Sequence, residues 1–276
     1  MQANTTQPLM ITVAPTGARV NATQFPNTPI TPKAIATEVI ECAKLGASIA
    51  HLHARDSLGN PTQSIEIFRE IVDRIRDKSD IVIQLSLGTK GMTVEQAIEP
   101  ITLDVEMGSL PLSAFEGGDT ELQDKIVGMS AMMSRHGIKP EMAIYGSAMM
   151  TGALRIIGEG ATQAPHCFGL ILGDPPSLRE GVEKLLALSA LVPKHSFWWA
   201  AKGGAHQLAL KSLAMELGGH VRVGFEDSPL DFRATAPAPS NAALVDQMAQ
   251  LALQLGKTIA TPQMARETLG LRAPKH

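Results

Sequence analysis

Two histidines separated by one residue are the first side chains of this sequence whose type and spacing favour chemistry. They are His51 and His53, in the segment HLHARD at 51–56. Residues i and i+2 of a β-strand point to the same face, about 6.6 Å apart along the chain, so both imidazoles are expected to project together. Neighbouring histidines at the carboxyl end of a strand could share one borderline-soft cation. The alternative is a pair of packed or exposed histidines that bind no metal.

A second group of ionisable residues lies far along the chain, in the segment HVRVGFED at 220–227. If this segment is a strand, Arg222, Gly224 and Glu226 share one face. Gly224 then leaves room inside, and Glu226 falls at the carboxyl end, where it could be a third metal ligand. Asp227 follows in the loop. Two histidines, one carboxylate and an open position are typical of a catalytic rather than a structural metal site. The alternative is a buried Arg–Glu ion pair followed by a helix-capping aspartate.

Three further polar residues fall at the ends of predicted strands. Ser86 and Ser109 end the segments IQLS and MGS. Hydroxyls there could hold a substrate carboxylate or carbonyl, whereas the commoner role of serine at such a place is to cap a turn. Glu141 follows Pro140 at the start of another strand. It is either an inward carboxylate near the metal or a salt-bridged strand end, and the sequence leaves both open.

These residues need a fold that brings the ends of separate strands together. Short runs rich in apolar and β-branched residues alternate with amphipathic helical patterns along the chain. The runs predicted as strands are 9–15, 47–54, 81–88, 101–108, 140–146, 166–173, 196–203 and 221–226. The helical patterns are 32–45, 64–77, 93–100, 119–136, 149–159, 177–191, 207–217 and 241–255.

Eight β-α units in about 250 residues predict an α/β fold, a closed (β/α)8 or TIM barrel. We expect it to form a single domain over residues 1–276. An open doubly wound sheet is the second candidate. It would want a glycine-rich phosphate turn after the first strand, but Gly17 stands alone there. In a TIM barrel the chemistry sits at the carboxyl ends of the strands.

The composition excludes several other classes of function. Lys plus Arg number 24 and Asp plus Glu number 27, a net charge of −3, which gives no basic footprint for nucleic acid and no polybasic membrane anchor. The apolar runs are too short to span a bilayer, and residues 1–15 lack the pattern of a signal peptide. The only cysteines, Cys42 and Cys167, provide no disulfide framework. We therefore expect a cytoplasmic protein.

The sequence resembles a known family, the β-keto acid cleavage enzymes. The matching segments are ITVAPTGA at 11–18, TPKAIATEVIECAKLGASIAHLHARD at 31–56, IQLSLG at 83–88, KPE at 139–141 and LGGHVRVGFEDSP at 217–229. HLHARD together with HVRVGFED is the specific part of this resemblance. The family implies a TIM barrel that assembles as a homotetramer and binds a divalent metal, normally Zn²⁺.

The resemblance also implies a role for each matching residue. His51, His53 and Glu226 resemble the family's metal ligands, and Arg222 with Asp227 resembles its base-forming pair. Substrate contacts are implied for Ser86, Ser109 and Glu141, the last at the place of an active-site glutamate.

One residue departs from the family pattern where the first strand ends. Members that cleave aminohexanoate have a glutamate directly after the strand's Gly-Ala, whereas Gly17 and Ala18 are followed here by Arg19. Arginine disfavours a cationic substrate because like charges repel. We therefore expect Arg19 to favour a substrate with a neutral or anionic tail.

The resemblance implies a metal-dependent enzyme that condenses a β-keto acid with acetyl-CoA and releases acetoacetate and a new acyl-CoA. Its partners are then small molecules and further copies of the chain. Two other classes stay open. An amidohydrolase-type metallohydrolase also uses H-x-H in a barrel, but it wants further histidines where strands five and six end, and this chain has IYG and ILG there. The other class is a non-catalytic barrel that binds a small acid.

Overall fold

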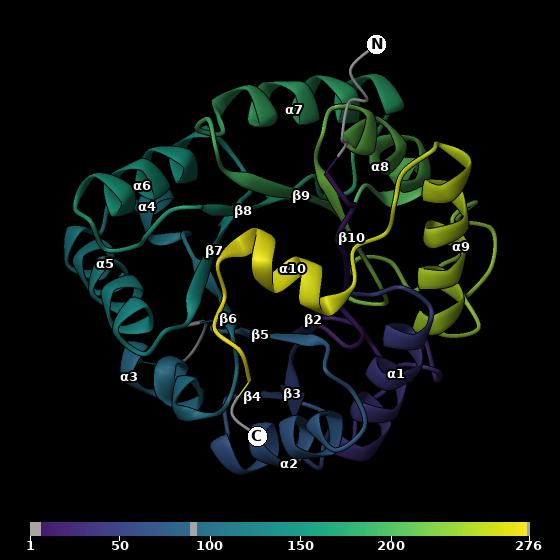
Figure 1. Ribbon diagram of the computed structural model, residues 1–276, viewed down its shortest axis with the longest axis horizontal. Helices are drawn as coiled ribbons and strands as arrows, with labels where there is room; N and C mark the ends of the chain where they lie inside the picture. The colour runs from purple at the N-terminus through teal and green to yellow at the C-terminus, as the bar shows by residue number, and fades with distance from the viewer. Residues whose placement is uncertain (1–6, 89–92, 275–276) are drawn as a thin grey trace.

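A computed structural model describes residues 7–88 and 93–274 of the chain. The predicted domain, 1–276, and the segment tested for a signal peptide, 1–15, both include residues outside these ranges. The described residues fold into a closed barrel of parallel strands, with helices around its outside (Figure 1). Around the barrel the strands follow the order β1-β10-β9-β8-β7-β6-β5-β2. The predicted α/β fold class, a TIM barrel, is confirmed.

The barrel strands are short and all pairings between them are parallel. Their bounds are β1 (Ile11–Val13), β2 (Ile49–Leu52), β5 (Val82–Ser86), β6 (Met107–Pro111), β7 (Lys139–Ile144), β8 (Cys167–Ile171), β9 (Phe197–Ala201) and β10 (His220–Val223). The barrel closes where β1 pairs with both the last strand and β2.

The predicted strand at 101–108 is wrong over most of its length. Residues Glu99–Thr102 form the 3-10 helix η1, and the strand β6 begins only at Met107. Ile101 and Leu103 are buried as a strand residue would be, but they pack in the apolar layer between the barrel and its helices. The prediction therefore placed the strand too early, because a short apolar run fits a barrel strand and this outer apolar layer equally well.

The helices lie close to their predicted ranges. They are α1 (Pro32–Lys44), α2 (Ile65–Arg76), α3 (Val94–Ile98), α5 (Thr120–Arg135), α6 (Ser147–Gly158), α7 (Leu178–Leu191), α8 (Gln207–Glu216) and α9 (Asn241–Gln254). Local sequence sets their ends. The Thr31 hydroxyl accepts a hydrogen bond from the Ala34 N–H ahead of the proline that opens α1, and Thr93 forms a capping box with Gln96.

Besides η1, the sequence did not predict five of the elements. These are a two-stranded sheet of β3 (Ala54–Arg55) and β4 (Pro61–Thr62), the short helix α4 (Ala114–Gly117), the 3-10 helix η2 (Gly204–His206) and the helix α10 (Pro262–Leu269). None of the helices in the described part of the chain combines the length and the apolar character that crossing a membrane requires.

Alternation along the strands separates two apolar layers. On β9, Trp199 joins the cluster inside the barrel with Met10, Ile49, Val82 and Met107, whereas its neighbour Trp198 packs outside, under the helices. Every second residue of a barrel strand therefore points inward. Large apolar side chains fill the inner layer near the amino ends of the strands, whereas several inward positions beyond it carry buried polar side chains.

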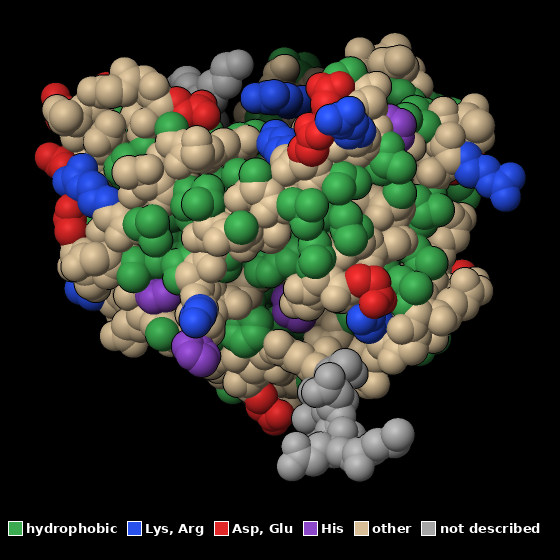
Figure 2. Space-filling model, turned by 90° about the horizontal axis from the view of Figure 1, so that it is seen from above, with side chains coloured by type: hydrophobic (Ala, Val, Ile, Leu, Met, Phe, Trp, Pro, Cys, Tyr) green, Lys and Arg blue, Asp and Glu red, His purple; other side chains and the backbone are tan. Residues whose placement is uncertain are grey.

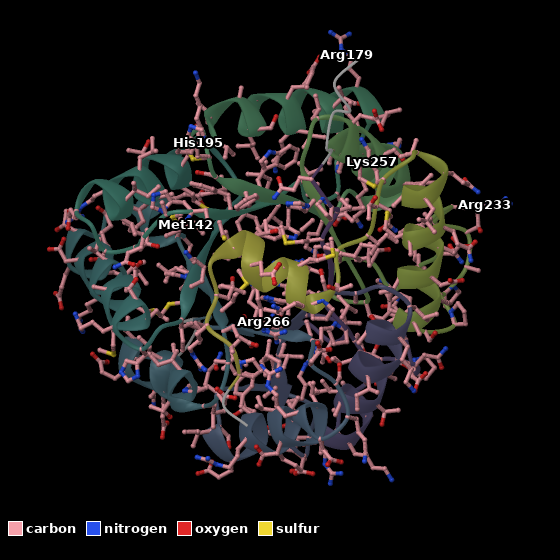
Figure 3. All side chains as sticks on the ribbon, viewed as in Figure 1. Met142, Arg179, His195, Arg233, Lys257 and Arg266 are labelled. Atoms are coloured by element: carbon pink, nitrogen blue, oxygen red, sulfur yellow. The ribbon has the colours of Figure 1, made fainter. Side chains whose placement is uncertain are left out.

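Helix α10 closes the amino end of the barrel. In Figure 1 it lies across the middle of the ring of strands, and Ala265 and Leu269 pack into the inner apolar cluster. Figure 3 marks Arg266 on the same helix. Its guanidinium pairs with Glu106 at 2.6 Å and donates to the Asp80 carbonyl oxygen at 2.5 Å. One end of the barrel is thus sealed, and the carboxyl ends of the strands form the other.

We predict that Glu106→Ala strongly destabilises this closed end. Glu106 is fully buried and pairs with Arg76 as well as Arg266. Its loss leaves two guanidiniums without their carboxylate, so unfolding in urea should show a loss of about 3–5 kcal/mol. The control is Glu70→Ala, which breaks an exposed pair with Arg74 and should cost within about 0.5 kcal/mol. Equal losses for the two variants would contradict the assignment.

Candidate active site

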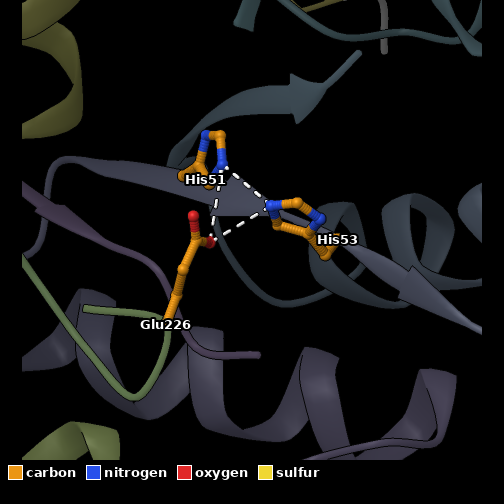
Figure 4. A group of neighbouring side chains, drawn as sticks. All are labelled: His51, His53 and Glu226. Carbon is orange, nitrogen blue, oxygen red and sulfur yellow. Dashed lines mark hydrogen bonds and ion pairs between the residues drawn. The ribbon is translucent and has the colours of Figure 1, made fainter. Parts of the chain in front are cut away.

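Two imidazoles and a carboxylate converge at the open end of the barrel (Figure 4). The Nε2 atoms of His51 and His53 are 3.3 Å apart, and the Glu226 Oε2 atom lies 3.5 Å from the first and 3.3 Å from the second. Ligand atoms 2.0–2.1 Å from a tetrahedral ion are about 3.3–3.4 Å from each other. The spacing therefore fits a single Zn²⁺-sized ion. Among the described residues this is the group of His, Cys, Asp and Glu side chains that could hold one.

The protonation of these donors also fits a metal site. Burial lowers the pKa of His51 to about 4, although the Glu226 charge acts in the opposite direction, so this imidazole is neutral near pH 7. Burial raises the pKa of Glu226, but Arg222 and the two histidines outweigh it and hold this pKa well below its usual value. The Glu226 Oε2 atom is buried and receives no hydrogen bond from the described residues. A bound cation would satisfy it.

Gln84, which the sequence analysis passed over, orients the first histidine. The Gln84 side chain donates through Nε2 to Glu141 Oε2 at 3.0 Å, so its Oε1 atom is left to accept from His51 Nδ1 at 2.6 Å. This hydrogen bond places the proton on Nδ1 and leaves the Nε2 lone pair facing Glu226. Such support of a ligating histidine is common at metal sites. The signal in the sequence was a polar residue two positions before Ser86, on the same face of one strand.

Glu141 is an inward carboxylate, which resolves the alternative that the sequence left open. It is buried in β7, paired in register with Ser109 on one side and Cys167 on the other. Burial raises its pKa, while its hydrogen bond from Gln84 acts against the rise. A Cβ atom at Gly169, on β8, would lie 2.7 Å from Glu141 Oε1. The glycine therefore leaves the space that this carboxylate occupies.

Glu226 and Asp227 come from a turn, so the predicted strand at 221–226 is too long. β10 ends at Val223, and Gly224 follows with φ 135°. A Cβ at Gly224 would collide with the carbonyl oxygen of Ala14, so the glycine permits a close approach of two backbones. The expectation that it leaves room inside is therefore wrong.

The turn directs both carboxylates at Arg222. The guanidinium donates to Asp227 through Nε at 3.1 Å and through Nη2 at 2.6 Å, and Nη2 also reaches Glu226 Oε1 at 3.2 Å. Burial lowers the pKa of Arg222, but the Asp227 and Glu226 charges raise it further than burial lowers it. The pair is a bidentate ion pair that holds the Asp227 carboxylate in one orientation.

The two serines lie side by side on neighbouring strands. Ser86 on β5 pairs in register with Ser109 on β6, and Ser109 in turn pairs with Glu141. Ser109 stands in the middle of its strand rather than at the end where the sequence placed it, because β6 runs on to Pro111. The three predicted substrate contacts thus form one row across the inner face of the barrel.

Arg19 stands apart from the metal-binding group. It is exposed in the loop that follows β1, and its charge acts on the phenol of Tyr145, at the carboxyl end of β7. Tyr145 is the only tyrosine of the chain and is 50% exposed. Burial of the phenol nevertheless raises its pKa. No sequence pattern pointed to Tyr145, because IYG contains no histidine or carboxylate that could bind a metal.

Comparisons with known proteins agree with the resemblance in sequence. A family model described as beta-keto acid cleavage enzyme matches residues 8–271. The chain is 36% identical to the 3-keto-5-aminohexanoate cleavage enzyme of Acetoanaerobium sticklandii, over 95% of this chain and 98% of that protein. It is 30% identical to the 3-oxoadipate:acetyl-CoA acetyltransferase of Cupriavidus necator, over 96% of each chain.

A solved structure also matches in fold. It is a ternary complex of ObcA with a C4-CoA adduct and oxalate, similar with a TM-score of 0.72 over 89% of this chain and 68% of that one. The sequences are 20% identical, so this likeness supports the barrel fold alone.

We predict that the chain binds one Zn²⁺ and that Gln84 contributes to its affinity. His53→Ala should abolish binding at that site because it removes a ligand. Gln84→Leu should weaken binding by about 10–100-fold, since His51 loses the hydrogen bond that fixes its tautomer. Competition with a chromophoric chelator measures both, with Gln250→Leu, an exposed residue of α9, as the control. Unchanged affinity in either of the first two variants would defeat the assignment.

Proposed function

Because the chain belongs to the beta-keto acid cleavage enzyme family, we propose that it cleaves a β-keto acid in an exchange with acetyl-CoA. The products are acetoacetate and a new acyl-CoA. The observation that carries the proposal is the convergence of His51, His53 and Glu226 beside the bidentate pair of Arg222 and Asp227. A candidate Lewis-acid site and a base thus lie side by side at the open end of the barrel.

His51, His53 and Glu226 would hold the metal, for which Zn²⁺ is the first choice and another divalent transition metal the second. When bound, the ion supplies Lewis-acid polarisation of the substrate's keto oxygen. The residues around it prepare the donors. Gln84 sets the tautomer of His51, and Arg222 keeps Glu226 ionised by holding a positive charge 3.2 Å from its Oε1 atom.

Asp227 acts as the base that removes the α-proton of the β-keto acid. Two hydrogen bonds from Arg222 orient its carboxylate, and the side chain of Asp227 is fully buried. A fixed, dehydrated carboxylate transfers protons efficiently because little reorganisation is needed during the reaction. Ser86, Ser109 and Glu141 form a row on the inner face of β5, β6 and β7, where they would contact the carboxylate or carbonyl groups of the substrate.

The remaining steps exchange one acyl group for another. The α-carbon of the deprotonated β-keto acid attacks the thioester carbonyl of acetyl-CoA, and the CoA thiolate leaves. The thiolate then attacks the original keto carbon of the adduct. The bond between that carbon and the α-carbon breaks, and the rest of the substrate becomes a new acyl-CoA. The carbanion that leaves takes back the proton held by Asp227 and is released as acetoacetate. Each bond formed is matched by one broken, and no oxidant or reductant is needed.

Arg19 selects the tail of the β-keto acid in this proposal. Its guanidinium is exposed on the loop after β1, so a carboxylate or an uncharged group is accepted there more readily than an amine. Cupriavidus necator 3-oxoadipate:acetyl-CoA acetyltransferase, by its name, acts on a keto acid with such a second carboxylate.

The two other classes of function fit the chain less well. An amidohydrolase-type metallohydrolase requires further histidines at the carboxyl ends of β7 and β8. These strands end in Ile144 and Ile171, and the described residues offer one candidate metal group. A non-catalytic acid-binding barrel would not need the buried Arg222–Asp227 pair, which costs desolvation energy.

We also propose a homotetramer that works in the cytoplasm. Figure 2 shows hydrophobic side chains gathered over the middle of the face that α7 forms with its neighbours, and Leu178, Leu186 and Leu191 of α7 are each more than 40% exposed. An apolar patch of this kind is typical of a protein interface. Both cysteines are free and buried, as suits a reducing compartment.

We predict that Asp227→Asn removes turnover and keeps the metal. The amide cannot accept the α-proton, so kcat should fall by at least about 100-fold, while Zn²⁺ binding stays as in the wild type. Acetoacetate release from a panel of β-keto acids with acetyl-CoA is the measurement. Asp246→Asn, on α9, is the matched control. A panel on which the wild type releases no acetoacetate, or full activity in Asp227→Asn, would refute the proposed role.

A charge reversal at Arg19 should change which tail is preferred. The wild type is expected to use β-keto acids with a carboxylate or neutral tail better than those with an amine. Arg19→Glu should shift the ratio of kcat/KM values toward the amine by roughly tenfold, about 1.4 kcal/mol, and Arg233→Glu should not. A wild type that prefers substrates with an amine tail would contradict the role given to Arg19.

The assembly proposal predicts that a charge on α7 dissociates the protein. Light scattering should give the mass of four chains for the wild type and a smaller mass for Leu186→Lys, because the lysine would be buried in an apolar contact. Leu253→Lys, at an exposed site of α9, tests for a general effect of the new charge. A monomeric wild type would rule the tetramer out.

A further inference from the structure

Arg55 is a buried cation whose partners are backbone carbonyls. It is 6% exposed and ends β3, two residues after His53. Its Nε atom donates to the Gly17 carbonyl oxygen at 2.9 Å, Nη1 to that of Gly59 at 2.7 Å and Nη2 to that of Val20 at 3.2 Å. Each nitrogen of the guanidinium is therefore engaged by the protein. Arg55 is accordingly not the group that would bind an anionic substrate.

These hydrogen bonds join two loops at the open end of the barrel. Gly59 belongs to the turn between β3 and β4, while Gly17 and Val20 belong to the loop that follows β1. The planar fork of arginine can reach three acceptors in fixed directions, which the single ammonium of lysine cannot do. Since Arg55 is buried, holding its charge here has a desolvation cost that an apolar side chain would avoid. That cost points to a role beyond packing.

The loop that Arg55 holds touches the metal-binding group. Gly17 has φ 63°, and a Cβ atom there would lie 2.7 Å from Glu226 Cγ. The backbone of the loop thus rests directly against the side chain of Glu226. Arg19 lies between the two carbonyls that Arg55 binds, at positions 17 and 20. Its backbone is fixed on both sides although its side chain is exposed.

We propose that Arg55 is a positioning residue, which sets the loop 17–20 so that Arg19 faces the substrate tail and Gly17 supports Glu226. It contacts neither substrate nor metal. The choice between substrate tails then depends on Arg55 through Arg19. This part of the inference rests on the proposed function, whereas the hold on the loop does not.

The first test needs no substrate. Hydrogen exchange of the backbone amides at 17–20 should be faster in Arg55→Met than in the wild type, because the two hydrogen bonds from Arg55 to this loop are lost. Arg55→Lys should change exchange in the same direction by less. The control is Arg272→Met, which removes a part-buried arginine at the closed end that donates to a backbone carbonyl and should leave exchange at 17–20 unchanged. Unchanged exchange at 17–20 in folded Arg55→Lys and Arg55→Met would overturn the inference.

The second test asks whether Arg55 acts through Arg19. The ratio of kcat/KM for a carboxylate-tailed β-keto acid to that for a neutral-tailed one should fall in Arg55→Met and in Arg19→Ala, by roughly tenfold in each. In the double variant the ratio should fall no further than in Arg19→Ala alone, since both changes remove one interaction. A merely structural loss would lower both kcat/KM values and leave their ratio intact.

The outcomes separate the two proposals. Multiplied effects on the ratio in the double variant, or an unchanged ratio in Arg55→Met, would overturn the route through Arg19. A wild type that cleaves no β-keto acid would refute the proposed function, and the exchange measurement would still decide whether Arg55 holds the loop.

Discussion

Three lone-pair donors meet within 3.5 Å of one another, on side chains that are 2–16% exposed, and the open end of the barrel is built around this constraint. Such atoms repel one another in a dry site unless a cation or a proton lies between them. The surrounding groups hold them in place. Gln84 turns His51 so that its lone pair faces inward, and Gly17 lets the loop after β1 lie against Glu226. Arg222 then offsets the negative charge of two adjacent carboxylates.

One end of the barrel serves stability and the other carries the candidate active site. At the amino ends of the strands, α10 and the Glu106 ion pairs seal an apolar interior. Toward the carboxyl ends, inward positions carry Gln84, Glu141 and Arg222, all buried and all hydrogen-bonded. Parallel strands with one inward residue in two make this division possible, because neighbouring strands deliver their polar residues at the same height. Loops such as 17–20 add the residues that face the substrate.

Alternation and β-α order were enough to predict the barrel and the convergence of His51 and His53, although β2 ends at Leu52 and His53 lies just beyond it. Glu226 was correctly expected at the carboxyl end of the barrel. It was expected as part of a strand, however, whereas the turn at Gly224 directs its side chain. The roles of Gln84 and Arg55 were not predicted because both depend on partners far away in the chain. The partners of Gln84 are 33 and 57 residues away, and those of Arg55 are up to 38 residues away. Periodicity within one segment cannot reveal such pairs. The misplaced strand at 101–108 has a related cause. The barrel strands and the layer that packs between barrel and helices are both apolar, so a short apolar run does not show which of the two it belongs to.

The most direct test of the central claim is the location of a bound ion by anomalous scattering from crystals grown with Zn²⁺. We predict one strong peak about 2.0–2.2 Å from His51 Nε2, His53 Nε2 and Glu226 Oε2 together. A peak bound by other residues, or three unchanged side chains with no ion between them at saturating Zn²⁺, would contradict it.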